Sequence, residues 1–296
     1  MIDKVWKNGK IISYEEAKIG INTHSLHYGS SAFEGIRAYD TPKGVGVLKL
    51  KEHMQRFIYS MSVLGMQCKY SLDELCQGVL NIVKESGLKS CYIRPIAYFA
   101  EGNIGVLPSK DHPVDIVIYC VDIGKYIKTD KVDVKVSKFI RIHPNSTFCD
   151  AKIGGHYVNS ILAARETVNT HYHEALLLDV NGYVAEGTAM NIFFVKNNEI
   201  ITTPLGTILN GITRKIIIQI ARDLGYKITE KLFTVDELIN SDEAFFCGTA
   251  AEITPISSVD DKKINSSDYK VTNKIIETFE KIKKGQTYQD YLTFIN

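Results

Sequence analysis

The sequence predicts a two-domain protein of the mixed α/β class. The chain has 296 residues, more than one small hydrophobic core normally serves. Amphipathic helical patterns and alternating strand patterns occur in both halves. Between the halves, a polar stretch containing glycine breaks the periodicity. We therefore expect a smaller N-terminal domain of residues 1–122, an interdomain loop of residues 123–131 and a larger C-terminal domain of residues 132–296.

Composition and charge narrow the classes of function. Hydrophobic residues make up 45% of the chain and charged residues 23%, as in ordinary globular proteins. A formal net charge of +1 gives no reason to expect a nucleic-acid or membrane partner. The N-terminus has no apolar signal region, and no apolar stretch is long enough for a membrane span. We expect a cytoplasmic protein.

Cysteine usage supports the same compartment. The six cysteines include no C-x-x-C pair. Four of them lie inside apolar runs, which predicts reduced, buried thiols at Cys76, Cys91, Cys120 and Cys247.

The first half begins with a hairpin signal, two short apolar runs around Asn8-Gly9. A helix is expected over residues 50–66, where Met54, Phe57 and Met61 fall on one face. Arg56 lies off this apolar stripe and is either solvated or functional. A second helix starts at the capping box of Ser71 and ends near residue 87.

Two strands follow in the first half. In the strand over residues 91–99, Tyr92 and Arg94 share one face. A phenol and a guanidinium in this arrangement either bind a carboxylate or form an outward polar face. The strand over residues 114–121 is mostly apolar, so we expect burial on both of its faces.

The second half is expected to continue with a strand over residues 132–139 and a helix over residues 157–168. Residues 175–201 read as a meander with a tight turn at Asn181-Gly182. A helix over 209–225, a strand over 243–246, a helix over 271–284 and a polar-aromatic tail complete the chain.

Chemistry is expected around Lys152, which stands beside the pair Gly154-Gly155. Desolvation in such a loop disfavours the ammonium form and can make the lysine a nucleophilic amine that forms a Schiff base. The alternative is an ordinary surface lysine. Glu186 ends an apolar strand, so it either faces water at the rim or needs a cation or strong donors nearby.

Two small-residue turns can supply N–H donors and a hydroxyl to a phosphate, although each can equally be a simple turn or cap. They are Gly211-Ile212-Thr213 and Gly248-Thr249-Ala250. Neither is a Walker loop or a dinucleotide fingerprint. His24 and His27 have no third ligand at helical spacing, so no metal is expected.

Taken together, a lysine, a carboxylate and two anion-binding turns are what pyridoxal 5'-phosphate requires. Further stretches are distinctive in their order: His27-Tyr28-Gly29, Phe33-Glu34-Gly35-Ile36-Arg37, residues 52–56, Tyr92-Ile93-Arg94-Pro95, residues 151–155, residues 179–182, Glu186-Gly187, residues 211–214 and residues 248–255. Through these stretches nearly the whole chain resembles the branched-chain amino acid aminotransferases. That family has the class IV, D-amino acid aminotransferase-like fold (fold type IV), with its active site between the domains.

The resemblance implies a role for each matching residue. Lys152 would be the catalytic Schiff-base lysine, Glu186 would pair with the pyridine nitrogen and Tyr157 with the ring oxygen. The phosphate would be bound by Arg56, Ile212, Thr213 and Thr249. The substrate would be bound by Phe33, Tyr28, Arg37, Tyr92, Arg94, Tyr126, Thr249 and Ala250. Within this set, Arg94 would meet the second carboxylate of glutamate or 2-oxoglutarate.

The implied reaction is reversible, ping-pong transfer of an amino group between leucine, isoleucine or valine and 2-oxoglutarate. The resemblance implies at least a homodimer, with a hexamer as the alternative assembly, in which the loop of residues 102–106 completes a neighbour's site. Alternatives are a D-amino acid aminotransferase, an aminodeoxychorismate lyase or a non-catalytic protein that binds the cofactor. Asp150, His156 and Ile123 depart from the family pattern and bear on the substrate ranking.

Overall fold

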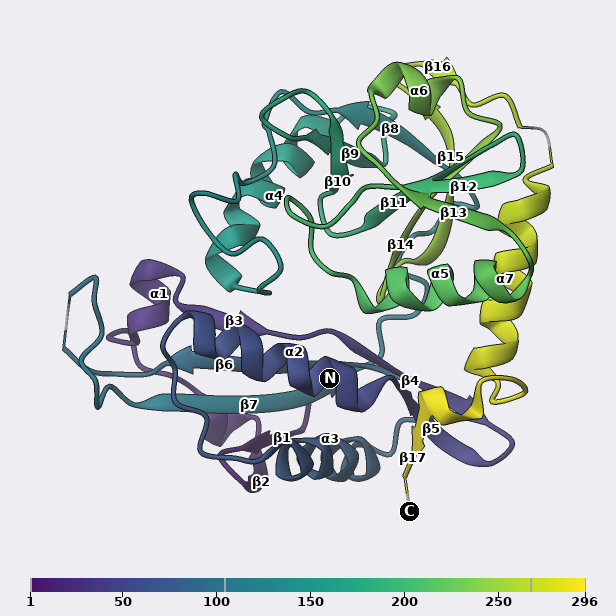
Figure 1. Ribbon diagram of the computed structural model, residues 1–296. Coiled ribbons are helices and arrows are strands. Elements are labelled where there is room, and N and C mark those ends of the chain that lie inside the picture. Colours follow the sequence, from purple (N-terminus) through teal and green to yellow (C-terminus); the bar gives the residue numbers. More distant parts are fainter. Residues whose placement is uncertain (1, 104, 267, 296) are drawn as a thin grey trace. The chain divides into compact units, whose positions relative to one another are not determined.

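A computed structural model describes residues 2–103, 105–266 and 268–295 (Figure 1). Contacts divide the chain into two compact units. Unit 1 comprises the chain up to Gly124, the segment Ala151–His156 and the chain from Ile282 onwards. Unit 2 comprises Lys125–Asp150 and Tyr157–Lys281. The expected division is different: here the segment that carries Lys152 and the C-terminal tail belong to unit 1, and residues 123–131 are divided between the two units.

Unit 1 is built on a sheet flanked by helices. Its strands are β1 (Lys4–Lys7), β2 (Lys10–Ser13), β3 (Ser31–Phe33), β4 (Ile36–Thr41), β5 (Gly44–Leu48), β6 (Cys91–Phe99), β7 (Val114–Val121) and β17 (Leu292–Phe294). Its helical segments are η1 (Glu15–Ala17), α1 (His24–Tyr28), α2 (Leu50–Val63), α3 (Leu72–Ser86), η2 (Gly154–His156) and η4 (Gln289–Tyr291). The eight strands are antiparallel in the order β17-β5-β4-β6-β7-β1-β2, and β3 pairs with β6.

Local signals place the first elements of unit 1 as predicted. Asn8 and Gly9 both have positive φ, 48° and 87°, which lets β1 turn tightly into β2. The predicted capping box opens α3, with the Ser71 hydroxyl accepting from the Glu74 N–H. Gly87 in the left-handed region ends this helix.

The core of unit 1 forms where α2 and α3 pack on the sheet (Figure 1). Met54, Phe57 and Met61 of α2 are fully buried, so the predicted stripe is confirmed. The prediction for residues 114–121 is wrong in one respect. Alternate residues of β7 enter the core, and those between them are only half-buried, because the second face of this strand carries no helix-packed core.

The C-terminal tail contains a strand that the sequence did not reveal. β17 pairs antiparallel with β5, with Leu292 opposite Leu48 and Phe294 opposite Gly46. Leu292 is 6% exposed. Its partner is more than two hundred residues away in the sequence, so no local pattern marks the pairing.

Unit 2 is built on a mixed sheet. Its strands are β8 (Val132–Val136), β9 (Glu174–Leu178), β10 (Val184–Gly187), β11 (Asn191–Lys196), β12 (Glu199–Thr202), β13 (Lys227–Glu230), β14 (Glu243–Gly248), β15 (Glu252–Val259) and β16 (Lys262–Lys263). Its helices are α4 (Tyr157–Ala164), η3 (Arg165–Thr167), α5 (Ile212–Asp223), α6 (Val235–Ile239) and α7 (Lys270–Lys283), whose last two residues belong to unit 1. The strand order is β10-β9-β8-β15-β14-β11-β12-β13, with β16 beside β15.

The predicted meander over residues 175–201 is wrong. β9 pairs with β10 and β11 pairs with β12, so the two hairpins exist. However, β9, β8, β15 and β14 stand between β10 and β11 in the sheet. β8 pairs in parallel with both β9 and β15, and it comes from a part of the chain outside the expected meander.

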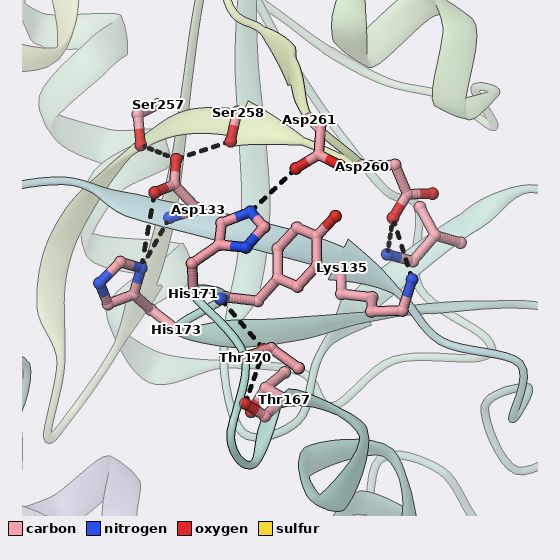
Figure 2. A network of polar contacts seen from close by, with 12 residues as sticks. Asp133, Lys135, Thr167, Thr170, His171, His173, Ser257, Ser258, Asp260 and Asp261 are labelled. Carbon is pink, nitrogen blue, oxygen red and sulfur yellow. Dashed lines mark hydrogen bonds and ion pairs between the residues drawn. The ribbon is translucent and has the colours of Figure 1, made fainter.

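A polar network joins β8 to β15 where their register shifts (Figure 2). Asp133 accepts hydrogen bonds from the hydroxyls of Ser257 and Ser258 at 2.7 and 2.6 Å. Its backbone N–H donates to His173 Nδ1 at 3.1 Å. One carboxylate thus satisfies two successive serines at the irregularity and helps to fix this parallel pair.

The cysteines follow the prediction only in part. All six are free thiols; Cys91, Cys120, Cys149 and Cys247 are buried, whereas Cys68 and Cys76 are half-buried. The prediction of a buried Cys76 is therefore wrong. Among the residues described, no helix has the length and apolar character needed to cross a membrane.

The tail strand provides a test of its packing role. Leu292→Ala should lower the free energy of unfolding by about 2–4 kcal/mol, because it removes a buried side chain that contacts β5. Thr293→Ala, an exposed change on the same strand, should cost roughly 0.5 kcal/mol or less. Urea unfolding measures both. Equal losses in the free energy of unfolding for the two variants would contradict the packing of Leu292 against β5.

Candidate functional site

The segment that carries Lys152 is held on unit 1 mainly through its backbone. Ile153 forms an antiparallel bridge to Ala32, and the Phe33 N–H donates to the Lys152 carbonyl at 3.0 Å. The Lys152 N–H donates to the Ser60 hydroxyl at 2.8 Å. Lys152 itself is half-buried. Lys152 is therefore held close to the main chain of unit 1.

The glycines beside Lys152 permit this close approach. The Gly155 N–H donates to the Gly29 carbonyl at 3.0 Å. A Cβ on Gly29, whose φ is +63°, would lie 2.9 Å from the Gly155 Cα. A Cβ on Gly154 would overlap the Ser31 hydroxyl. Two segments of main chain therefore pack against each other at a distance that side chains would prevent.

One aromatic ring brings the candidate lysine and a candidate substrate arginine together. The Lys152 Nζ lies 4.8 Å from the centroid of the Phe33 ring, and the Arg94 Cζ lies at the same distance from it. Both cations contact the ring at cation–π distance. Phe33 pairs with Ile96 across β3 and β6, which places its side chain on the same sheet face as Arg94.

The face that carries Arg94 is not an outward polar surface. Tyr92 is only 9% exposed, and its hydroxyl accepts a hydrogen bond from Arg94 Nη2 at 2.9 Å. Arg37 stands directly opposite Tyr92 in the neighbouring strand and donates to the Gly124 carbonyl at 3.4 Å. In the described part of the chain, the buried Nε–H of Arg94 meets no acceptor. Such a donor is suited to a ligand oxygen.

Gly35 makes room for the Tyr92 hydroxyl. A Cβ at this position would overlap the phenol oxygen and approach the ring carbon that bears it to 2.8 Å. Gly35 has no positive φ, so its small size is what the fold requires here. The phenol oxygen therefore reaches the main chain between β3 and β4.

Arg56 is neither solvated nor isolated, because it forms a buried ion pair. Its Nε and Nη2 donate to the two carboxylate oxygens of Glu34 at 2.6 and 3.0 Å. His53 Nδ1 donates to Glu34 Oε2 at 2.7 Å. The Glu34 side chain is 0% exposed, and those of Arg56 and His53 are 11% and 3% exposed. Sequence reasoning assigned no role to Glu34 or His53.

Burial and charge act in opposite directions on this cluster. Burial alone would raise the pKa of Glu34, but the Arg56 charge and the hydrogen bonds from both partners hold the pKa well below its ordinary value. Burial lowers the pKa of His53, and the neighbouring charges of Arg56 and Lys152 act in the same sense against the opposing effect of Glu34. Glu34 is therefore ionised, and His53 is neutral near pH 7.

In unit 2, Glu186 is a buried carboxylate with several donors. Arg141 Nε donates to its Oε1 at 2.7 Å, and Asn191 Nδ2 donates to its Oε2 at 3.1 Å. The Leu209 N–H reaches both oxygens at 3.4 and 3.3 Å. Glu186 is 5% exposed, so the alternative of a water-facing rim residue is wrong.

Arg141 and Asn191 are further residues that sequence reasoning missed. Burial alone would lower the pKa of Arg141, but the charge and the hydrogen bond of Glu186, with smaller contributions from Cys149 and Tyr157, together raise it. The available signal was an arginine inside the apolar run Phe139-Ile140-Arg141-Ile142. A charge in such a run needs an opposite charge nearby, but the sequence does not say which one.

The two candidate anion-binding turns both lie in unit 2. Gly211 precedes α5, and a Cβ there would overlap the Asn191 amide oxygen. Ile212 and Thr213 are buried in the first turn of this helix. Thr249 and Ala250 are half-buried in the turn between β14 and β15.

Three further predicted residues are tyrosines. Tyr157 is the first residue of α4 and is half-buried. Tyr28 is 40% exposed beside His24, and Tyr126, near the start of unit 2, is 57% exposed. The predicted loop 102–106 includes Ile104, which lies outside the described residues.

Comparisons with known proteins all indicate the same family of enzymes. The family model for amino-transferase class IV matches residues 31–259. A branched-chain-amino-acid aminotransferase of Pseudomonas aeruginosa is 38% identical over 288 residues, which cover 96% of this chain and 94% of that protein.

Solved structures give the same result. The crystal structure of the Escherichia coli branched-chain amino acid aminotransferase has a TM-score of 0.96 and 36% identity, with 100% of both chains covered. The branched-chain amino acid aminotransferase of Thermobaculum terrenum, solved in its PLP-bound holo-form, has a TM-score of 0.93 and 30% identity, covering 100% of this chain and 99% of that one. Further branched-chain amino acid aminotransferase structures hold N-(5'-phosphopyridoxyl)-L-glutamate or 4-methylvaleric acid.

The contact at Gly35 can be tested by stability. Gly35→Ala should lower the free energy of unfolding by about 1–3 kcal/mol, because the new methyl group overlaps the Tyr92 hydroxyl. In a Tyr92→Phe background, the same change should cost less, since the overlapping oxygen is gone. Thermal unfolding of the four proteins gives both values. The same cost in both backgrounds would show that the hydroxyl is not the obstacle.

Proposed function

This chain belongs to the class IV aminotransferases, and we propose that it reversibly transfers the amino group between L-leucine, L-isoleucine or L-valine and 2-oxoglutarate. The relatives that it matches along almost their full length carry the name branched-chain-amino-acid aminotransferase. Its fold is the type IV fold of enzymes that depend on pyridoxal 5'-phosphate. The observation that carries the proposal is the pair of cations, Lys152 and Arg94, on the one ring of Phe33.

The residues present fit the cofactor. Glu186 is a buried carboxylate whose charge Arg141 supports, which suits a partner for a protonated ring nitrogen. When bound, the cofactor supplies an electron sink for the substrate's α-carbon. We assign Lys152 as the amine that carries the cofactor and moves the proton at the α-carbon. Tyr157 is assigned to the ring oxygen.

The phosphate is assigned to four residues. Arg56 supplies a guanidinium, and Ile212 and Thr213 supply N–H donors in the first turn of α5, a helix of 12 residues. Thr249 adds a hydroxyl or N–H from its turn. Arginine suits this role because its planar fork matches the geometry of phosphate oxygens.

The substrate is assigned to an aromatic wall with an arginine at its edge. Phe33, Tyr28 and Tyr126 would contact the side chain. The main chain of Thr249 and Ala250, with the Tyr92 hydroxyl, would bind the α-carboxylate. Arg94, supported by Arg37 on the neighbouring strand, would bind the second carboxylate of glutamate, and its buried Nε–H is suited to a carboxylate oxygen.

The assembly and location are part of the proposal. By its family we assign the protein as a cytoplasmic homodimer at least, in which the loop of residues 102–106 completes the site of a neighbouring subunit. On the described side of that loop, the Gly105 carbonyl lies 2.8 Å from His24 Nε2. His24 is buried, so it can anchor the loop to the body of unit 1.

The function is tested by an absorbance spectrum before and after L-leucine is added. The wild type should show a visible band of lysine-bound cofactor that leucine shifts to shorter wavelength. Lys152→Ala should bind the cofactor without this cycle and lose at least about a thousandfold in turnover. Lys89→Ala, a change of an exposed lysine, should behave as wild type. A band that responds to D-alanine but not to leucine would contradict the substrate assignment.

The role of Arg94 is tested by comparing two substrates. Arg94→Ala should lower kcat/KM for glutamate about 10- to 100-fold more than for leucine, because it removes charge-assisted hydrogen bonds that only glutamate uses. Arg94→Lys keeps the charge but not the planar fork of the guanidinium, so its relative loss of kcat/KM for glutamate should lie between those of the wild type and Arg94→Ala. Steady-state kinetics measures both ratios. Equal losses on glutamate and leucine would refute this assignment.

A further inference from the structure

Glu34 is a buried carboxylate to which the proposed chemistry gives no role. It lies between β3 and β4, its side chain is 0% exposed, and the Gly35 N–H donates to its Oε2 at 3.1 Å. A charge in such a place persists only where cations or strong donors compensate it. Its two further partners, Arg56 and His53, both come from α2.

The geometry of the contact restricts how the guanidinium can lie. Arg56 meets Glu34 side-on, with Nε and Nη2 each on a different carboxylate oxygen. This planar fork allows one orientation of the guanidinium, whereas a single hydrogen bond would allow rotation. His53 fixes the carboxylate in turn, because its neutral ring donates from Nδ1 to Oε2. The Nη1 edge of Arg56 is therefore directed away from Glu34.

The same face of α2 also holds the backbone of Lys152. His53, Arg56 and Ser60 follow one another at spacings of three and four residues, so they share one side of the helix. The Ser60 hydroxyl donates to the Arg56 carbonyl at 2.8 Å and accepts from the Lys152 N–H at 2.8 Å. Through Ser60, the helix that carries Arg56 is fixed to the Lys152 main chain. A guanidinium held in one orientation on this helix therefore also has a defined orientation relative to Lys152.

We propose that Glu34, supported by His53, is a positioning residue that holds the Arg56 guanidinium in the one orientation suited to the cofactor phosphate. This inference rests on the proposed assignment of Arg56 to that phosphate. Charge alone predicts the opposite of positioning. An anion beside Arg56 weakens its attraction for a phosphate, so removal of the Glu34 charge would strengthen phosphate binding if geometry were unimportant. The two effects therefore differ in sign.

The experiment compares two forms of the cofactor. Apoprotein is titrated to equilibrium with pyridoxal 5'-phosphate and with pyridoxal, which lacks the phosphate, and the visible absorbance gives each Kd. The ratio of the two values isolates the phosphate contribution, because a general loosening of the site weakens both ligands. Glu34→Gln should reduce the preference for the phosphorylated form about tenfold or more. An unchanged or increased preference overturns the proposal.

A double-mutant cycle separates this inference from its premise. Arg56→Ala should itself reduce the preference, and adding Glu34→Gln to it should change nothing further, because Glu34 acts only through Arg56. If Arg56→Ala leaves the preference unchanged, the assignment of Arg56 to the phosphate fails. If Arg56→Ala reduces the preference and Glu34→Gln does not, only the positioning role fails.

Two more variants complete the design. Glu34→Asp keeps the charge and retracts the carboxylate, so it should fold even if Glu34→Gln does not, and it should reduce the preference several-fold. A wild-type preference in Glu34→Asp overturns the positioning role. Glu85→Gln makes the same chemical change in an exposed ion pair with Lys4 and should leave the preference unchanged. A reduced preference in Glu85→Gln would overturn the specificity of the effect for Glu34.

Discussion

The main-chain contact between residues 29–33 and the segment 151–155 is the constraint on which the candidate site depends. It joins Phe33 to Lys152 and Gly29 to Gly155 by backbone hydrogen bonds. Backbone bonds position the Cα of Lys152 without involving its side chain, whose Nζ lies over the Phe33 ring. This close approach disfavours larger residues, because a Cβ on Gly29 would lie 2.9 Å from the Gly155 Cα and a Cβ on Gly155 would lie 3.2 Å from the Gly29 carbonyl oxygen. This physical requirement explains the glycine pair beside the lysine.

Two buried carboxylates are each compensated by an arginine, but the member of the pair that is proposed to face the ligand differs between them. Glu34 and Glu186 each lie in an apolar part of a sheet, and each is paired with an arginine, Arg56 or Arg141. In unit 1 the arginine is the group proposed to meet a ligand, and the carboxylate orients it. In unit 2 the carboxylate is proposed to meet the ligand, and Arg141 compensates its charge. Burial makes each pair rigid, because separating its members would leave an uncompensated charge.

Elements set by local chemistry could be predicted from the sequence, and those set by distant pairing could not. The hairpin at Asn8-Gly9 and the capping box at Ser71 depend on neighbouring residues, and both are present. The tail strand β17 and the position of β8 inside the second sheet depend on partners far along the chain. Among charged residues, Arg56 and Glu186 lie in recognisable motifs. The role of Arg141 could not be predicted, because it depends on the ion pair with Glu186, 45 residues away.

The environment of Arg94 suits the role that we propose for it, beside a substrate side chain that is either apolar or acidic. Its guanidinium already lies on the rings of Phe33 and Tyr92 and donates to the Tyr92 hydroxyl. These contacts compensate part of its charge, so an apolar substrate beside it does not leave a bare buried cation. A carboxylate substrate offers stronger acceptors, which the buried Nε–H can meet. Under this proposal, discrimination between the two substrate classes would depend on the free-energy difference between a cation–π environment and an ion pair, a modest difference that suits an enzyme that binds both in turn.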